Sequence, residues 1–96
     1  MRVISKKPLR DFWEHHPESK PVLEEWFRKV SRLTATSFPV LRQTFNSADY
    51  VDGFTIFNVG GNRYRIAAVI HYDKQRLYVR QVMTHVEYNR NHWRKK

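Results

Sequence analysis

The sequence predicts an α+β domain in which N-terminal helices pack on a small antiparallel sheet and a short helix closes the chain. Two observations lead to this prediction. Apolar residues in the first third recur with the period of a helix, whereas from Asp52 onward they gather in three β-rich runs separated by short turns. The 96 residues contain no linker, repeat or low-complexity stretch, so we expect a single domain over 1–96.

Helices are expected in the first half of the chain. The first spans 8–16, with Ser5 as a candidate N-cap and Pro17 ending it. The stretch up to residue 47 that follows the second helix predicts either a short third helix or an irregular crossing. The second helix spans 19–33, and its apolar stripe is expected to face the core: Val22, Leu23, Trp26, Phe27, Val30 and Leu33.

Strands are expected over 54–59, 63–72 and 76–83, where β-branched and aromatic residues are frequent. The Gly-Gly-Asn sequence at 60–62 tolerates positive φ, which predicts a tight hairpin turn. A phosphate-binding loop is a poor alternative, because the GxxxxGK[ST] motif is absent. The strands should form an antiparallel meander, to which residues 2–5 can add an edge strand. The core should combine residues of the second helix with residues of the meander: Trp26, Phe27, Ile66, Ala68, Ile70, Leu77 and Val79.

The charge of the chain gives the first indication of function. Eighteen Lys and Arg residues against nine Asp and Glu leave a net charge of +9. Nine of the basic residues but only two of the acidic ones lie in 63–96. This concentration indicates a polyanionic partner, which would be nucleic acid, an acidic protein or an anionic membrane surface. The chain has no cysteine, no signal-peptide pattern and no apolar stretch long enough to span a membrane, so we expect a cytoplasmic protein with no membrane partner.

Strict alternation along the two longest strands gathers basic residues on one face of the sheet. Such a face can hold phosphates on guanidinium groups and stack unpaired bases on aromatic rings. A solvated face that is charged only for solubility is the alternative. The opposite face, which includes Gln81 and Met83, is expected to meet the helices. The residues predicted to point away from the helices are Arg63, Arg65, Ala67, Val69 and His71 from one strand and Arg76, Tyr78, Arg80 and Val82 from the next.

A Thr-x-x-Glu capping box at Thr84 and Glu87 predicts the short C-terminal helix. It places His85 and Tyr88 three residues apart on one side of the first turn. His, Tyr and Arg are the groups that metal-free RNA cleavage needs: a base for the 2′-OH proton, an acid for the 5′-oxygen, and cations for the phosphoryl oxygens. A capping turn with incidental polar residues is the alternative. No metal and no cofactor are expected, because cysteines are absent and the histidines lack ligand-type spacing.

The segments FNVGGNRYRIAAVI (57–70) and YVRQVMTHVEYNR (78–90) together resemble the HigB group of type II toxins, which are relatives of the RelE-like ribonucleases. The segments RVISKKPLRDFWEHHP and SFPVLRQTFNSADYV are also similar, so the resemblance covers nearly the whole chain. It implies a RelE-like fold and endonucleolytic cleavage of mRNA, typically on translating ribosomes. It also implies a HigA-like helix-turn-helix antitoxin, through which the pair binds its operator DNA.

The resemblance further implies a catalytic set of four residues, Arg65, Arg80, His85 and Tyr88. His85 would be the general acid or base, Tyr88 its partner or a base-stacking ring, and the arginines would hold the phosphate. A non-catalytic RNA-binding module and a protein-interaction domain with an acidic partner remain as alternatives from other classes. The residues expected to bind RNA are Asn62, Arg63, His71, Lys74, Arg76, Tyr78, Arg90, Arg94, Lys95 and Lys96.

Overall fold

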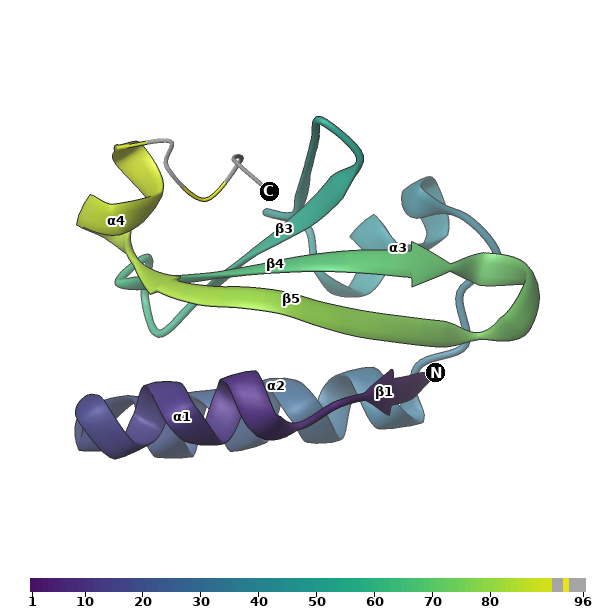
Figure 1. The fold of residues 1–96 in the computed structure, drawn as a ribbon. Coiled ribbons are helices and arrows are strands. Elements are labelled where there is room, and N and C mark those ends of the chain that lie inside the picture. The colour runs from purple at the N-terminus through teal and green to yellow at the C-terminus, as the bar shows by residue number, and fades with distance from the viewer. Residues whose placement is uncertain (91–92, 94–96) are drawn as a thin grey trace.

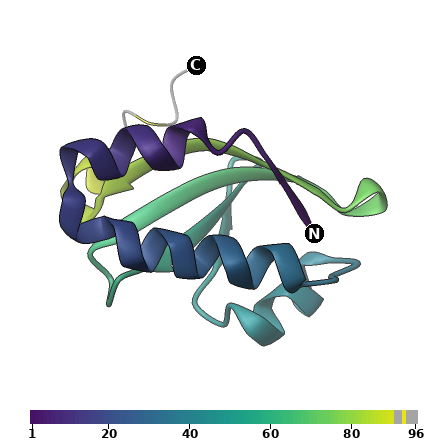
Figure 2. The same cartoon turned by 90° about the horizontal axis from the view of Figure 1, so that it is seen from below.

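The structure is a computed structural model that describes residues 1–90 and 93, and it contains one five-stranded sheet in the order β1-β5-β4-β3-β2. Helices α1 and α2 lie along one face of this sheet and α4 lies on the other (Figures 1 and 2). The strands are β1 (Arg2–Ile4), β2 (Asp49–Val51), β3 (Phe54–Val59), β4 (Tyr64–His71) and β5 (Arg76–Thr84). The helices are α1 (Lys7–His15), α2 (Lys20–Arg32), α3 (Phe38–Thr44) and α4 (His85–Asn89), with 3-10 turns at η1 (Pro17–Ser19) and η2 (Tyr72–Lys74).

The predicted α+β class is confirmed, with the N-terminal helices on a small sheet and a short helix at the end. Two details differ from the expectation. The sheet is mixed rather than fully antiparallel, because β1 pairs in parallel with β5, where Val3 lies opposite Leu77. The three residues of β2 form a further edge strand that the sequence did not predict, since so short a segment has no measurable alternation. Within the described part of the chain, no helix is both long and apolar enough to cross a membrane.

The N-terminal helices begin and end within two residues of the predicted bounds. The expected capping by Ser5 is wrong: Ser5 has a φ of 65°, and the residue at the N-cap is Lys6, which makes no side-chain cap bond. The open choice after α2 resolves into helix α3, where Ser37 accepts a hydrogen bond from the Val40 N–H at 3.5 Å. Ser5, two residues before the start of α1, carries the same hydroxyl group as Ser37. The two serines differ in backbone geometry, and only Ser37 stands at an N-cap position.

The turn at 60–62 is the predicted hairpin, since its three residues have φ values of 64°, 61° and 78°. The start of β4 beside this turn is anchored to the helix layer. The Tyr64 hydroxyl donates to Glu18 at 3.1 Å, and its ring packs edge-on against Phe12. Burial, together with the hydrogen bond to Glu18, raises the pKa of Tyr64, whereas a backbone hydrogen bond lowers the pKa of Glu18. The hydrogen bond from the neutral Tyr64 to the ionised Glu18 thus ties the turn to the helix layer.

A β-bulge in β5 changes which residues of that strand face the helices. The pairing runs from Ile70 with Leu77 to Ala68 with Val79, and then resumes at Ala67 with Gln81, so Arg80 has no partner in β4. One extra residue reverses the alternation beyond it. The predicted faces of Gln81, Val82 and Met83 are therefore wrong: Val82 packs toward the helices, and Met83 packs on the other face.

The main core lies between the sheet and helices α1 to α3, as predicted. Of the seven residues expected there, Phe27 and Ile70 are partly buried, and the five that are fully buried are Trp26, Ile66, Ala68, Leu77 and Val79. A second, smaller apolar cluster covers the opposite face of the sheet; it consists of Phe54, Ile56, Ala67, Met83 and Trp93, with Val51, Val69 and Tyr88 packed against it. The sheet face expected to be an open basic surface is therefore partly covered.

Candidate active site

The candidate active site lies where β4 begins, β5 ends and α4 starts. The capping box predicted there is present: the Thr84 hydroxyl accepts from the Glu87 N–H at 3.2 Å, and the Glu87 carboxylate accepts from the Thr84 N–H at 2.8 Å. The His85 N–H donates to the Arg63 carbonyl at 2.9 Å, which ties α4 to the β3–β4 turn. The capping box joins the first turn of α4 to the end of β5, and the backbone hydrogen bond joins it to the β3–β4 turn. Together these contacts fix the position of His85.

Arg65 is the cation at the centre of the site. The residue is only 6% exposed, and its strand partner Met83 belongs to the apolar cluster on the sheet face away from the main core. Nη1 donates to the carbonyls of Asn62 at 3.0 Å and Tyr64 at 3.2 Å, and Nη2 lies 3.0 Å from Nδ1 of His85. None of the ion pairs found among residues 1–90 and 93 involves Arg65. A guanidinium at this depth usually has a carboxylate beside it, because burying an unpaired charge is costly.

Tyr88 completes the predicted group around Arg65. The guanidinium carbon of Arg65 lies 5.4 Å from the centre of the Tyr88 ring, within the range of a cation–π contact. Trp93 stacks on the same ring at 5.2 Å with an interplanar angle of 16°, and its indole N–H donates to the Tyr88 carbonyl. These two contacts occupy the ring of Tyr88, which favours a role as partner of Arg65 over a role as a free surface for a base.

Asn89 is a member of the site that sequence reasoning missed. Its side-chain amide lies 3.0 Å from Nε2 of His85, one helical turn earlier in α4. The signal that could have found it is the spacing of four residues from His85, which puts both side chains on one face of a helix. Arg65, His85, Tyr88 and Asn89 therefore form one connected group.

A hollow of about 180 Å³ lies against this group, lined by Gln81, Met83, Glu87, Arg90 and Trp93. The hollow adjoins this group because Met83, which lines it, is the strand partner of Arg65. The exposed Arg90 side chain brings a further positive charge to the rim. The site therefore offers a recess with the Arg90 cation and the Glu87 carboxylate in its lining, next to the strand position of Arg65.

Arg80 does not join the group, although the sequence placed it there. It stands at the bulge and lines a hollow of about 340 Å³ on the side of α1, together with residues such as Phe12 and His16. The expectation that strict alternation brings Arg80 beside Arg65 is wrong, because the extra residue in β5 breaks that alternation. Of the predicted catalytic set, the structure brings together Arg65, His85 and Tyr88.

The residues predicted to bind RNA fall into two groups. Asn62, Arg63 and Arg90 lie beside the site. Asn62 supplies a carbonyl to Arg65, the exposed Arg63 donates to the Gly60 carbonyl, and Arg90 lines the hollow next to α4. The second group occupies the far end of the β4–β5 hairpin, six residues along β4 and so about 20 Å from Arg65. That group consists of His71, Lys74, Arg76 and Tyr78, in which the rings of His71 and Tyr78 meet edge-on at 5.4 Å. Arg94, Lys95 and Lys96 lie outside the described residues.

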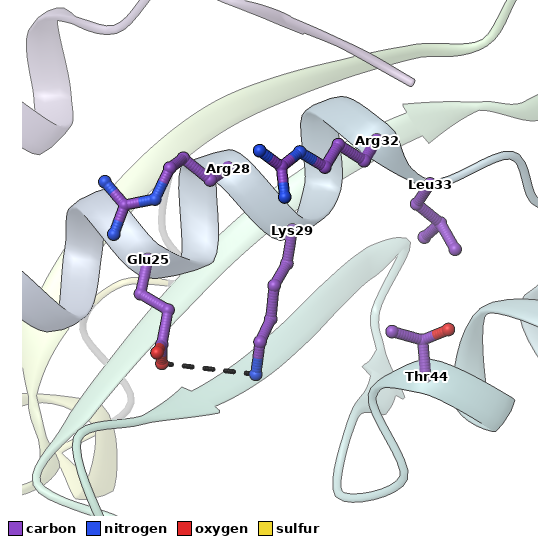
Figure 3. Close-up of a pocket in the computed structure, with 6 residues that line it drawn as sticks. All are labelled: Glu25, Arg28, Lys29, Arg32, Leu33 and Thr44. Atoms are coloured by element: carbon purple, nitrogen blue, oxygen red, sulfur yellow. Dashed lines mark ion pairs between the residues drawn. The ribbon is translucent and has the colours of Figure 1, made fainter.

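A second basic hollow, of about 480 Å³, lies on the opposite side of the molecule between α2 and α3 (Figure 3). Arg28 and Arg32 stand one turn apart on α2, and Lys29 forms an ion pair with Glu25 at 4.0 Å. The lining residues are Glu25, Arg28, Lys29, Arg32, Leu33 and Thr44. This hollow contains cations but no histidine or tyrosine, so it can bind an anion without offering acid–base chemistry. Among the described residues, no group of three or more His, Cys, Asp or Glu is arranged to hold a metal ion.

The chain matches known proteins over most of its length. Residues 19–91 match a family model described as HigB_toxin, a RelE-like toxic component of a toxin-antitoxin system. The chain is similar to the mRNA interferase toxin HigB of Escherichia coli K12, with 36% identity over 97 residues that cover 93% of this chain and 88% of the relative. It is also similar to the mRNA interferase HigB of Escherichia coli O6:H1, with 26% identity over 93 residues that cover 94% of this chain and 90% of the relative.

Proposed function

Because the chain belongs to the HigB family of RelE-like toxins, we propose that it cleaves mRNA at the group formed by Arg65, His85 and Tyr88, through attack of the ribose 2′-OH and without a metal ion. The family membership makes it the toxin of a toxin–antitoxin pair and an endoribonuclease of the mRNA interferase type. The proposal adds where cleavage occurs and by which chemistry.

One observation carries the proposal: the buried guanidinium of Arg65 lies beside a histidine and a tyrosine and forms none of the carboxylate ion pairs found in the described chain. A substrate phosphate would supply the missing negative charge. As the phosphorane-like transition state forms, its oxygens gain charge, and a cation already held in place stabilises that charge without reorganising. The same cation beside a carboxylate would have been largely neutralised before substrate arrived.

The reaction needs only proton transfers besides this charge stabilisation. The 2′-oxygen attacks the adjacent phosphorus while a base takes its proton, and a bond forms between the 2′-oxygen and phosphorus. The bond from phosphorus to the 5′-oxygen breaks, and that oxygen takes up a proton. His85 serves one of these proton transfers, since an imidazole has a suitable intrinsic acidity, and Tyr88 is the candidate for the other.

The products give a direct test of this chemistry. We expect fragments with a 2′,3′-cyclic phosphate and a 5′-hydroxyl, and an unchanged rate in excess EDTA. Mass spectrometry of fragments from a synthetic RNA, with and without the chelator, measures both. Fragments with 5′-phosphate ends, or cleavage abolished by the chelator, would indicate water activated by a metal instead.

We also propose that the enzyme acts on ribosome-bound mRNA. The support is the presence of exposed cations on opposite faces of the molecule, Arg63 and Arg90 beside the catalytic group and Arg28 with Arg32 at the hollow on α2 (Figure 3). Helix α2 lies across the sheet from α4, so the two sets of cations face away from each other. RNA that surrounds the toxin contacts both faces, and the ribosome is such an environment.

The double substitution Arg28→Glu and Arg32→Glu tests this second proposal. Because it removes two phosphate contacts away from the catalytic face, we expect cleavage of ribosome-bound mRNA to fall by roughly tenfold or more. Affinity for a short free RNA, measured by fluorescence anisotropy, should be nearly unchanged. The control is the equally charged pair Lys7→Glu and Arg10→Glu on α1. Equal losses with ribosomes and with free RNA would show that only net charge matters.

The family also implies an antitoxin as the protein partner. We propose that this antitoxin is a HigA-like helix-turn-helix protein and that the complex reaches operator DNA through it. The basic surface of the toxin favours an acidic segment of such a partner. An mRNA substrate would place the activity in the cytoplasm.

A further inference from the structure

Both ring nitrogens of His85 have a side-chain neighbour at hydrogen-bonding distance. Nη2 of Arg65 lies 3.0 Å from Nδ1, and the amide nitrogen Nδ2 of Asn89 lies 3.0 Å from Nε2. A guanidinium has donors only, so Nδ1 must be the acceptor in its contact with Arg65. A neutral imidazole carries a single ring proton, and here that proton belongs on Nε2.

The Nε2 proton then needs an acceptor, and the amide of Asn89 is the group in place. An amide has an acceptor oxygen and a donor nitrogen on one short arm, and the surrounding hydrogen bonds decide which of them meets the neighbour. The amide nitrogen that faces Nε2 would bring donor against donor once Nε2 is protonated. The amide therefore turns over, and its oxygen accepts the hydrogen bond from Nε2–H. The partners of His85 thus select one tautomer out of two.

The helix makes this arrangement rigid. The capping box fixes the first turn of α4, and Asn89 follows His85 by four residues on the same side of the helix. The imidazole is held by β4 through Arg65 and by α4 through Asn89. Its rotation about the Cβ–Cγ bond is therefore restricted from both ends.

We propose that Asn89 is a positioning residue that holds the Nε2 proton of His85 and so makes Nδ1 the base for the 2′-OH. This inference rests on the proposed function and assigns the proton transfer within it. In the free enzyme Nδ1 is paired with Arg65. A substrate phosphate is a stronger partner for a guanidinium than a neutral imidazole is, so the Nη2 N–H exchanges Nδ1 for the phosphate and frees the Nδ1 lone pair. Nη1 stays on the carbonyls of Asn62 and Tyr64, so the guanidinium keeps its place.

The step then balances as follows. Nδ1 takes the 2′-OH proton while the bond from the 2′-oxygen to phosphorus forms and the bond from phosphorus to the 5′-oxygen breaks. The 5′-oxygen receives a proton from Tyr88 or from water. The imidazolium that results keeps its Nε2–H on the oxygen of Asn89, which stabilises the positive charge.

Nitrogen NMR of the histidine rings tests the tautomer without any cleavage assay. The protein is labelled with ¹⁵N-histidine and measured at a pH at which the imidazole rings are neutral. Nε2 of His85 should then give the signal of a protonated ring nitrogen and Nδ1 that of an unprotonated one. The signals lost in His85→Gln identify the residue. Arg65 already selects this tautomer in the free protein, so the effect of Asn89 is measured in the complex with a 2′-deoxy RNA, whose phosphate engages Arg65. There we expect Asn89→Ala to produce a mixture of the two tautomers, and Asn89→Asp, which keeps an acceptor oxygen at the same reach, to restore the single one.

Single-turnover kinetics at saturating RNA test the consequence. Asn89→Ala should lower the cleavage rate by about tenfold to hundredfold with little change in affinity, and Asn89→Asp should recover most of the loss. Val86→Ala is the control, because Val86 is exposed on α4 and its side chain is absent from the hydrogen-bonded group. Circular dichroism checks that α4 and the fold persist in each variant.

A wild-type His85 protonated on Nδ1, or an Asn89→Ala protein that cleaves at the parental rate, would overturn the inference. An active His85→Gln protein would instead remove His85 from the proposed function. The two failures are distinguishable, because the NMR measurement reports the tautomer whether or not the residue takes part in cleavage.

Discussion

The substitution His85→Gln should lower the rate of RNA cleavage by about 10²–10⁴-fold while RNA affinity changes little. Glutamine keeps a hydrogen-bonding side chain of similar reach, and Arg65 can still donate to its amide oxygen. What glutamine lacks is a group that gains and loses a proton near neutral pH. The loss should therefore fall on the chemical step, which single-turnover cleavage at saturating RNA measures, and the dissociation constant should stay near its parental value.

His15→Gln is a matched control, because His15 is an exposed histidine at the end of α1, on the face of the sheet opposite α4. It should leave both quantities unchanged. If His85→Gln cleaves at the parental rate, the proton transfer belongs elsewhere, and Tyr88→Phe becomes the next variant to examine. Should both be harmless, cleavage would depend on Arg65 holding the phosphate in line with the 2′-OH.

The second large effect is expected at Arg65. Arg65→Ala should reduce kcat/KM by about 10²–10³-fold, because the buried guanidinium is the charge closest to His85 and the best placed to stabilise the transition state. Arg65→Lys should recover only part of the loss. Lysine keeps the charge, but a single ammonium group does not reproduce the fork that holds two carbonyls and the imidazole together.

Arg80→Ala is the informative comparison, since it removes the same side chain from the same sheet at an exposed position by the bulge. We expect it to reduce kcat/KM by less than about tenfold, through weaker phosphate attraction alone. Thermal unfolding must accompany the assays, because Arg65→Ala also leaves the carbonyls of Asn62 and Tyr64 without their donor. Equal catalytic losses at the two positions, with folding intact, would contradict the separation of Arg80 from the site.

Much of the site was open to prediction because its parts are local. The Thr84–Glu87 capping box depends on four consecutive residues, and it placed His85 and Tyr88 correctly in the first turn of α4. The position of Arg65 in β4 followed from a regular stretch of strand. The predicted position of Arg80 was wrong because a bulge arises from how two strands pair, and the sequence of β5 alone does not reveal it.

The contact of Asn89 with His85 and the burial of Arg65 were, like the bulge, not predictable from the local sequence. Asn89 is an ordinary polar residue near a helix end until the structure shows its amide beside His85. The second apolar cluster, with Trp93 against Tyr88 and Phe54, covers a sheet face that alternation alone would leave open to solvent. Arg65 lies on that face, is buried, and takes part in none of the ion pairs found among residues 1–90 and 93.

The sequence by itself determined the α+β class, helices α1, α2 and α4, strands β3, β4 and β5, the hairpin turn at 60–62, the capping box and the basic character of the C-terminal third. Each of these depends on interactions between residues a few positions apart, so periodicity and local chemistry are enough to reveal them. The tertiary structure alone decided the parallel pairing of β1, the reversal of faces beyond Arg80, the burial of Arg65 and the contacts on both nitrogens of His85. Those features depend on which distant segments meet and in which register, and a shift of one residue in that register turns a side chain from one face of the sheet to the other.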